Sequence, residues 1–206
     1  MILYYAPLSC AVASHIALET AGAKYEARRL DFRAGEQRSP AYLAINPKGR
    51  VPALVTDRGV ITETPAILAY IAQTHPHANL APLNDPFLFA QLQSFNSYLC
   101  ATVHVAHAHR IRGTRWADDD AAIASMKKKV PQNMTDCFSL IENEVFTGPF
   151  IFGETYTISD IYLYTLSTWL EGDGVDIRLF PKIAEFQNRL NDDPAIVRVL
   201  AAQTSP

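Results

Sequence analysis

The sequence predicts an α/β domain followed by an all-helical domain, with a short linker between them. Three observations carry this prediction. Short strand and helix patterns alternate through the first third of the chain, a proline-rich stretch without periodicity follows at 74–86, and only helical periodicity is found beyond it. We therefore place an α/β domain at 1–76, a linker at 77–85 and a helical domain at 86–206.

The composition is that of an ordinary globular protein. The chain has 206 residues, is 49% hydrophobic and carries a formal net charge of −3, so it can bury the core of one or two domains. This slight acidity gives no support to nucleic-acid binding. Since no apolar run approaches the roughly 20 residues that span a bilayer, and the N-terminus lacks the features of a secretory signal, we expect a cytoplasmic protein without a membrane partner.

The first strand and helix meet at a cysteine. Residues 2–5 form a strand pattern, Pro7 interrupts it, and apolar residues recur at helical spacing over 11–21. Gly22 stands where a left-handed helix cap is expected. Cys10 therefore lies at the start of the helix, and a strand–turn–Cys–helix start is the layout of thioredoxin-like folds.

Cys10 is the candidate reactive residue. A thiol at a helix N-terminus faces unpaired backbone N–H groups and the positive end of the helix dipole, which favour the thiolate. Ser9 and Pro7 make a polar, turn-like approach to it, which favours a reactive thiol over a buried core cysteine. His15 lies about 140° around the helix from Cys10, so we expect it to be structural. Cys100 and Cys137 look like core positions, and the three cysteines have neither disulfide nor metal-type spacing.

The rest of the first domain completes the order βαβαββα. We expect a strand at 25–30, a short helix at 39–43 with Ser39 as N-cap, strands at 51–55 and 60–62, and a helix with Thr64 as N-cap and Pro65 at its first position. Proline cannot donate to a strand ladder, so Pro52 at a strand start is unusual. A cis Val51–Pro52 bond would account for it and leave the Val51 backbone free to pair with a molecule outside the protein.

The second domain has five helical patterns, at 86–112, 119–145, 157–170, 181–190 and 194–202. Thr157 and Asp160 fit a capping box with Asp in place of the usual Glu, which we interpret as a folding signal.

Four motifs together carry a family resemblance. They are Ser9-Cys10, the run from Asn46 to Leu54, the run from Glu63 to Ile67, and the box from Thr157 to Asp160. In this order and spacing, the chain resembles the cytosolic glutathione transferases over essentially its whole length, and Cys10 makes it most similar to the bacterial beta class. The resemblance implies a thioredoxin-like first domain, glutathione as cosubstrate without a metal, and a homodimer built on the long helices of the second domain.

The resemblance also implies roles for named residues. Val51, next to Pro52, would pair its backbone with the cysteinyl part of glutathione, while Cys10 and Ser9 would stabilise the glutathione thiolate. Glu63 would pair with the ammonium group, and Thr64 at the helix start would receive the α-carboxylate, which is what a helix N-terminus favours. Where the beta class tends to have a lysine, this chain offers Arg33 for the glycyl carboxylate.

A histidine-rich helix is the candidate wall of the electrophile pocket. His104 and His107 share a helix face, with Arg112 and Trp116 further on, whereas His109 is rotated away, so the three histidines do not converge on one metal ion. A polar, aromatic wall of this kind can hydrogen-bond a substrate. Surface histidines without a ligand are the alternative. The family pattern of Asn and His one face apart is altered, because the position seven residues before His104 is Ser97.

Three functions fit these residues. The first is conjugation of the glutathione thiolate to small hydrophobic electrophiles. The second is a glutathione-dependent disulfide oxidoreductase in which Cys10 forms a mixed disulfide. The third is a transferase-like binding module without turnover, which the presence of the whole residue set disfavours. The physiological electrophile does not follow from fold-level analogy.

Overall fold

The computed structural model describes residues 1–204, and their contacts divide into two compact units. The first comprises Met1–Leu92 and the C-terminal segment from Asn191, and the second comprises Gln93–Leu190. The C-terminal helix therefore groups with the first unit. The expected domains at 1–76 and 86–206 stay a prediction, and the last two residues of the second one lie outside the described residues.

A four-stranded sheet forms the centre of the first unit. Its strands are β1 (Ile2–Tyr5), β2 (Glu26–Arg29), β3 (Ala53–Thr56) and β4 (Gly59–Thr62), in the spatial order β2-β1-β3-β4. β1 pairs parallel with β2 and antiparallel with β3, and β3 pairs antiparallel with β4. The expected alternation of strands and helices is confirmed.

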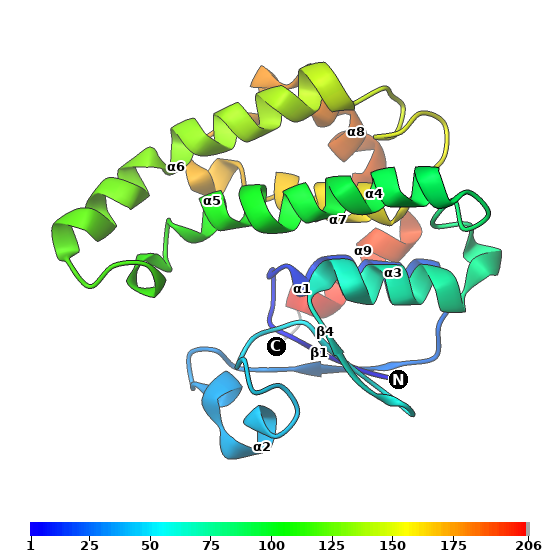
Figure 1. Ribbon diagram of the computed structural model, residues 1–206, viewed down its shortest axis with the longest axis horizontal. Coiled ribbons are helices and arrows are strands. Elements are labelled where there is room, and N and C mark those ends of the chain that lie inside the picture. The colour runs from blue at the N-terminus through cyan, green and yellow to red at the C-terminus, as the bar shows by residue number, and fades with distance from the viewer. Residues whose placement is uncertain (205–206) are drawn as a thin grey trace. The chain divides into compact units, whose positions relative to one another are not determined.

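Helices cover both faces of this sheet. They are α1 (Ala11–Thr20), α2 (Pro40–Leu43), α3 (Thr64–Thr74) and α9 (Pro194–Thr204). Figure 1 shows α1, α3 and α9 on one face and α2 on the other. Alternate strand residues point to opposite faces, and accordingly Tyr4 packs against Tyr42 of α2, with ring centroids 5.5 Å apart, while its neighbour Tyr5 contacts His15 of α1.

Short sequence signals correctly predicted most of the helix ends in this unit. Gly22 has φ +63° just after α1, and the Ser39 side chain accepts a hydrogen bond from the Tyr42 amide, as expected. The prediction of Thr64 as an N-cap was wrong. Glu63 is the N-cap of α3, because it adopts φ +72° and its carbonyl accepts the first helical bond, from the Ile67 amide. Thr64 is the first helical residue.

The longest helices begin at Pro86 and Asp120. Besides α9, the α-helical elements after the linker region are α4 (Pro86–Tyr98), α5 (His104–Ala108), α6 (Asp120–Leu140), α7 (Ile158–Ser167) and α8 (Pro181–Asn191), with π-helical turns at Leu99–Val103 and Ile141–Val145. Short 3₁₀ turns lie at Glu36–Arg38, Pro76–Ala78, Gly113–Arg115, Glu171–Asp173 and Ile177–Leu179. The expected helix at 86–112 is thus helical without a break from Pro86 to Ala108, with a π-helical turn in its middle, and residues 109–112 lie outside it.

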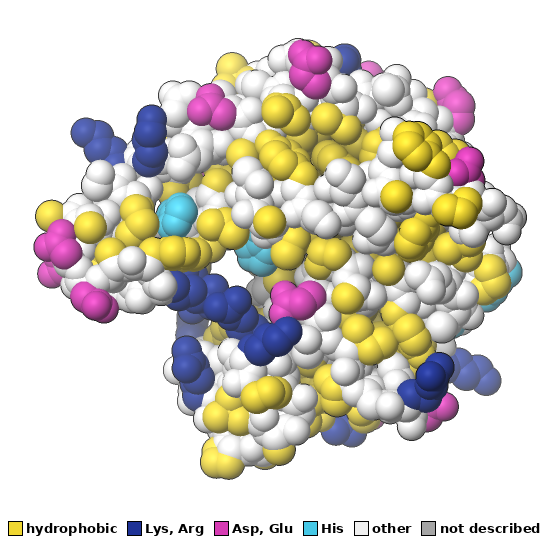
Figure 2. Space-filling model, viewed as in Figure 1, with side chains coloured by type: hydrophobic (Ala, Val, Ile, Leu, Met, Phe, Trp, Pro, Cys, Tyr) yellow, Lys and Arg dark blue, Asp and Glu magenta, His cyan; other side chains and the backbone are white. Residues whose placement is uncertain are grey.

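The surface carries charges of both signs. Figure 2 shows basic and acidic side chains on the same face of the molecule, in keeping with the nearly balanced charge of the sequence. Within residues 1–204, no helix is both long and apolar enough to cross a bilayer.

The most buried helix of the second unit, α7, begins with the predicted capping box. Every residue of α7 is buried, and Thr157 and Asp160 make the two reciprocal bonds of the box. Asp160 also binds outside the helix: its Oδ1 accepts from the Ile151 amide at 2.7 Å, while its Oδ2 accepts from the amide and the hydroxyl of Thr157, each at 2.8 Å. Burial raises the pKa of Asp160 to about 6, against the opposing effect of these donors. The carboxylate joins the connector at Ile151 to α7.

Replacing Asp160 by Ala removes the acceptor for three donors in a buried place. We expect Asp160→Ala to lower the free energy of unfolding by about 3 kcal/mol, because buried donors left without partners keep their desolvation cost. Chemical denaturation at fixed protein concentration measures it. Asp85 is a matched control, since it caps α4 through the Phe87 and Leu88 amides from an exposed position, where loss of the cap costs about 1 kcal/mol. Equal losses in the two variants would contradict this interpretation.

Candidate functional site

The Cys10 thiol contacts the turn that contains Val51 and Pro52. It is the residue just before α1, it is 9% exposed, and its thiol donates to the Val51 carbonyl with Sγ 3.5 Å from the oxygen. The Val51–Pro52 peptide bond is cis, as predicted. Two residues 41 positions apart in the sequence are therefore in contact, and the start of α1 lies against the segment that leads into β3.

The first turn of α1 differs from the expectation of unpaired amides. The Ala11 amide donates to the Ser9 hydroxyl at 3.3 Å, and the amides of Val12 and Ala13 donate to the carbonyls of Ser9 and Cys10 at 3.0 and 3.2 Å. The expectation was wrong for these three amides, because the turn is tight and the Ser9 side chain caps it. What α1 offers a nearby anion through these residues is its dipole.

Ser9 holds the turn before the helix. Its hydroxyl donates to the Ala6 carbonyl at 2.7 Å while accepting from Ala11. Because a hydroxyl has one hydrogen to donate, Ser9 has no donor left for a ligand in this arrangement. A direct role of Ser9 toward a thiolate stays a prediction that requires the hydroxyl to turn.

The Val51 backbone is held in place yet keeps an unpaired donor. The carbonyl of the preceding Arg50 accepts from the Tyr42 hydroxyl at 2.6 Å and from the Asn46 side-chain amide at 2.7 Å. Within residues 1–204, no hydrogen-bond partner is found for the Val51 N–H. Because Val51 is only partly exposed and its N–H has no acceptor within the described chain, this N–H is a candidate contact for a peptide-like ligand.

Glu63 lies beside a basic residue that the sequence analysis did not single out. Its exposed carboxylate pairs with the Lys48 ammonium, Oε1 to Nζ, at 2.5 Å, and Lys48 also donates to the Thr62 hydroxyl at 2.8 Å. The position of Lys48 inside the Asn46–Arg50 turn was the available signal, because that turn leads to the cis-proline. Lys48 and Glu63 therefore place a positive and a negative charge together at the start of α3.

The start of α3 has two backbone amides without a partner among the described residues. Pro65 has no amide hydrogen, and the first intrahelical bond at this end comes from the Ile67 amide. Among the described residues, the amides of Thr64 and Ala66 have no hydrogen-bond partner. Unpaired amides at the positive end of an 11-residue helix favour a carboxylate.

Arg33 lies in the loop after β2. The residue is exposed, and its backbone amide donates to Asp31 Oδ1 at 2.7 Å. This bond shapes the loop and leaves the predicted contact of the Arg33 guanidinium with a glycyl carboxylate as a prediction.

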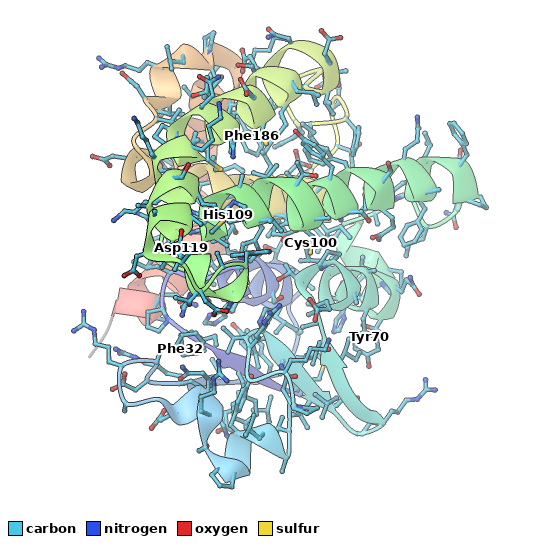
Figure 3. The ribbon with its side chains drawn as sticks, turned by 60° about the vertical axis from the view of Figure 1, so that its left-hand side comes forward. Phe32, Tyr70, Cys100, His109, Asp119 and Phe186 are labelled. Carbon is cyan, nitrogen blue, oxygen red and sulfur yellow. The ribbon has the colours of Figure 1, made fainter. Side chains whose placement is uncertain are left out.

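In the second unit, two of the four predicted pocket residues lie together. The rings of His104 and His107 both pack on Trp169, with centroids 5.1 and 4.1 Å away, and the His107 ring is stacked on it. Trp116 instead packs on His109, at 4.4 Å. Figure 3 labels His109 and the partly exposed Cys100 on the helical segment that carries these histidines. The second unit thus has two aromatic pairs, and Arg112 is partly buried near the second of them in sequence.

A buried carboxylate orients His107. Nδ1 of His107 lies 2.8 and 2.9 Å from the two oxygens of Asp173, whose side chain is fully buried and also lies 3.0 Å from Arg110 Nε. The Nδ1–H donates to the carboxylate, so Nε2 points elsewhere. Asp173 was missed, because it lies 66 positions away and belongs to no local motif. Among residues 1–204 no three His, Cys, Asp or Glu side chains are grouped as a metal site.

Comparison with known proteins places these features in a family. The model for the glutathione S-transferase N-terminal domain matches residues 1–73. A glutathione transferase homologue from Sulfitobacter, solved with bound glutathione, is 41% identical with a TM-score of 0.95, and the alignment covers 99% of this chain and 98% of that one. The chain belongs to the glutathione S-transferase family.

Other glutathione S-transferases match over almost the full length. The beta-class enzyme of Sphingomonas chungbukensis is 29% identical, with a TM-score of 0.86 and 99% of each chain covered. The protein GST-4.5 of Xanthomonas campestris is 28% identical over 203 residues, with 98% of each chain covered. The expected resemblance to this family, with beta-class members among the similar structures, is confirmed.

His15 makes the stability of this transferase depend on pH. The ring is 4% exposed, contacts Tyr5 and Tyr25, and accepts at Nδ1 from the Gln203 side-chain amide. Burial lowers the pKa of His15, with an opposing effect from Glu19. As pH falls below about 6.5, the unfolded chain takes up a proton at this position before the folded protein does, so the free energy of unfolding decreases.

We expect His15→Gln to lose this part of the pH dependence, since Gln does not titrate. Unfolding of both proteins, followed in denaturant between pH 7.5 and pH 5, would show a steeper loss for the original protein. Parallel curves would mean that His15 titrates alike in the folded and unfolded states.

Proposed function

We propose that this protein transfers the thiolate of glutathione to small hydrophobic electrophiles. The observation that carries the proposal is that Val51, whose carbonyl accepts from the Cys10 thiol, has an unpaired N–H and lies in a cis-proline turn fixed by two hydrogen bonds. Its relatives support it, since they include proteins named glutathione S-transferase and a structure with bound glutathione.

Each polar group of glutathione has a candidate partner in the first unit. The backbone of Val51, before Pro52, pairs with the cysteinyl moiety. The Glu63 carboxylate pairs with the α-ammonium. This contact either adds to the present ion pair of Glu63 with Lys48 or replaces it. The open amides of Thr64 and Ala66 receive the α-carboxylate.

The glycyl carboxylate needs a cationic partner. Arg33 is exposed in the loop after β2, where the beta class tends to have a lysine, and we assign this role to it. A guanidinium can hold a carboxylate through two parallel bonds, which fixes its orientation as well as its charge.

The chemistry starts from a stabilised sulfur anion. Bound along Val51, the glutathione sulfur lies toward Cys10, whose thiol turns its hydrogen from the Val51 carbonyl to the thiolate. The α1 dipole favours the same anion, and each unit by which the pKa of the glutathione thiol is lowered is worth about 1.4 kcal/mol. The glutathione proton leaves to solvent. The thiolate then attacks the electrophilic carbon, the new C–S bond forms, and the leaving group departs with its electron pair.

The electrophile is assigned to side chains of the second unit. We place His104, His107, Arg112 and Trp116 along its pocket, where aromatic rings supply apolar area and the imidazole and guanidinium groups can hydrogen-bond a substrate or leaving group. The packing of both histidine rings on Trp169, with only the His107 ring stacked, supports the assignment of these two residues to one wall of the pocket.

The remaining family features are proposals of the same kind. We assign glutathione binding to a domain at 1–76 and electrophile binding to a domain at 86–206. A homodimer is expected with the long helices around 86–112 and 119–145 supplying much of the contact.

Cys10→Ser separates this function from disulfide reduction through a mixed disulfide. A serine hydroxyl can still donate to a thiolate, but it cannot form the disulfide. We expect conjugation of a chloronitrobenzene to stay within about tenfold of the original rate, and reduction of hydroxyethyl disulfide by glutathione to be lost. Loss of conjugation as well would refute the noncovalent mechanism, and a protein that binds a glutathione column without either activity would be a binding module.

Glu63→Gln tests the assignment of the ammonium group. Removing the negative charge weakens a charge-assisted hydrogen bond, so we expect the KM for glutathione to rise about tenfold while kcat changes little. Glu26→Gln is the control, because Glu26 is another exposed glutamate in an ion pair, with Arg28 on the edge strand β2. The same change in KM for both variants would argue against a specific contact at Glu63.

A further inference from the structure

The turn before Cys10 is attached to the far end of the chain. Leu8 adopts φ +55°, a left-handed conformation that is uncommon for a residue other than glycine. Its amide donates to Oε1 of Gln203 at 3.1 Å, across 195 positions of sequence. The Leu8 side chain is 58% exposed, so packing of that side chain contributes little to holding this conformation.

Gln203 is fixed at both ends of its amide group. The side chain is 1% exposed, and while Oε1 accepts from Leu8, Nε2 donates to His15 Nδ1 at 3.1 Å. His15 is itself held between the rings of Tyr5 and Tyr25, with centroids 5.4 and 5.5 Å away. The two bonds define the orientation of the Gln203 amide and place the proton of neutral His15 on Nε2.

A second bond docks the same helix without reaching the turn. Arg198 of α9 pairs with Glu19 of α1, Nε to Oε1, at 2.6 Å, and both side chains are more exposed than Gln203. Arg198 therefore shares with Gln203 the task of holding α9 against α1, and Gln203 alone of the two bonds the segment that leads to Cys10.

We propose that Gln203 is a positioning residue for Cys10. By holding the Leu8 amide, it keeps the turn from Ala6 to Ser9 in the form that delivers Cys10 to the start of α1, against the Val51 carbonyl. Gln203 acts through the turn and contacts no ligand. The inference rests on the proposed function for its kinetic readout only, since the reactivity of Cys10 can be measured without any turnover.

Gln203→Met tests it, because methionine has nearly the same length and retains the packing while it loses both bonds. We expect the rate of Cys10 alkylation by iodoacetamide, mapped by mass spectrometry to the Cys10 peptide, to fall about tenfold at pH 7 with a shifted pH profile. For chloronitrobenzene conjugation, we expect kcat to fall and the KM for glutathione to stay unchanged. Arg198→Met is the matched control, and we expect it to leave the alkylation rate within about twofold.

Equal alkylation rates in Gln203→Met and the original protein would overturn the proposal, as would an equal decrease in Arg198→Met, which would show that docking of α9 as a whole is responsible. If Gln203→Met does not fold, hydrogen exchange in the original protein decides instead. The Leu8 amide, next to an exposed side chain, is expected to exchange as slowly as the amides of α9, and fast exchange contradicts the proposal. A protein with the expected alkylation pattern and no conjugation would refute the proposed function and leave this inference standing.

Discussion

The contact between the Cys10 thiol and the Val51 carbonyl is the constraint on which the rest of the site depends. The Tyr42 hydroxyl and the Asn46 side-chain amide hold the preceding Arg50 carbonyl, so the turn that carries the Val51 carbonyl is fixed. The same turn leaves the Val51 N–H without a partner among the described residues. The Cys10 thiol and an unpaired peptide donor thus lie at the same turn, which is the arrangement that the proposed binding of a cysteine-containing peptide requires.

The first amides of α1 have hydrogen-bond partners, whereas two of the first amides of α3 have none among the described residues. In α1, the Ser9 side chain and tight carbonyl bonds satisfy the amides of Ala11 to Ala13. In α3, a proline and a glutamate N-cap in a left-handed conformation leave the Thr64 and Ala66 amides open. In the proposed function, direct hydrogen bonding to an anion is therefore assigned to the start of α3, and only long-range dipole stabilisation of a sulfur anion is assigned to α1. A carboxylate is a strong acceptor and suits the unpaired amides of α3. A thiolate is large and accepts weakly, and it suits the dipole of α1.

Features that depend on residues close together in the sequence were predictable. The strand and helix order, the left-handed Gly22, the Ser39 cap, the cis-proline and the Thr157 box each follow from residue types within a few positions of one another. The N-cap of α3 was misplaced by one residue, because a left-handed glutamate has no local signal. The partners of His107 and Leu8 were out of reach for another reason. Asp173 lies 66 positions from His107, and Gln203 lies 195 positions from Leu8. Periodicity predicts the helix face on which a residue lies, but it does not predict which distant residue packs against that face.

The grouping of α9 with the first unit links reactivity to folding. The Gln203 bond that fixes the Leu8 turn and the Arg198 bond to Glu19 both need α9 to be folded on α1. Helix termini open locally at free energies well below that of global unfolding, and Gln203 lies in the last turn of α9. Each opening of that turn therefore frees the Leu8 amide while the sheet, α1 and α3 stay intact. The conformation that presents Cys10 is then only as stable as the final turn of a C-terminal helix, so the stability of that turn sets an upper limit on how well the thiol is preorganised.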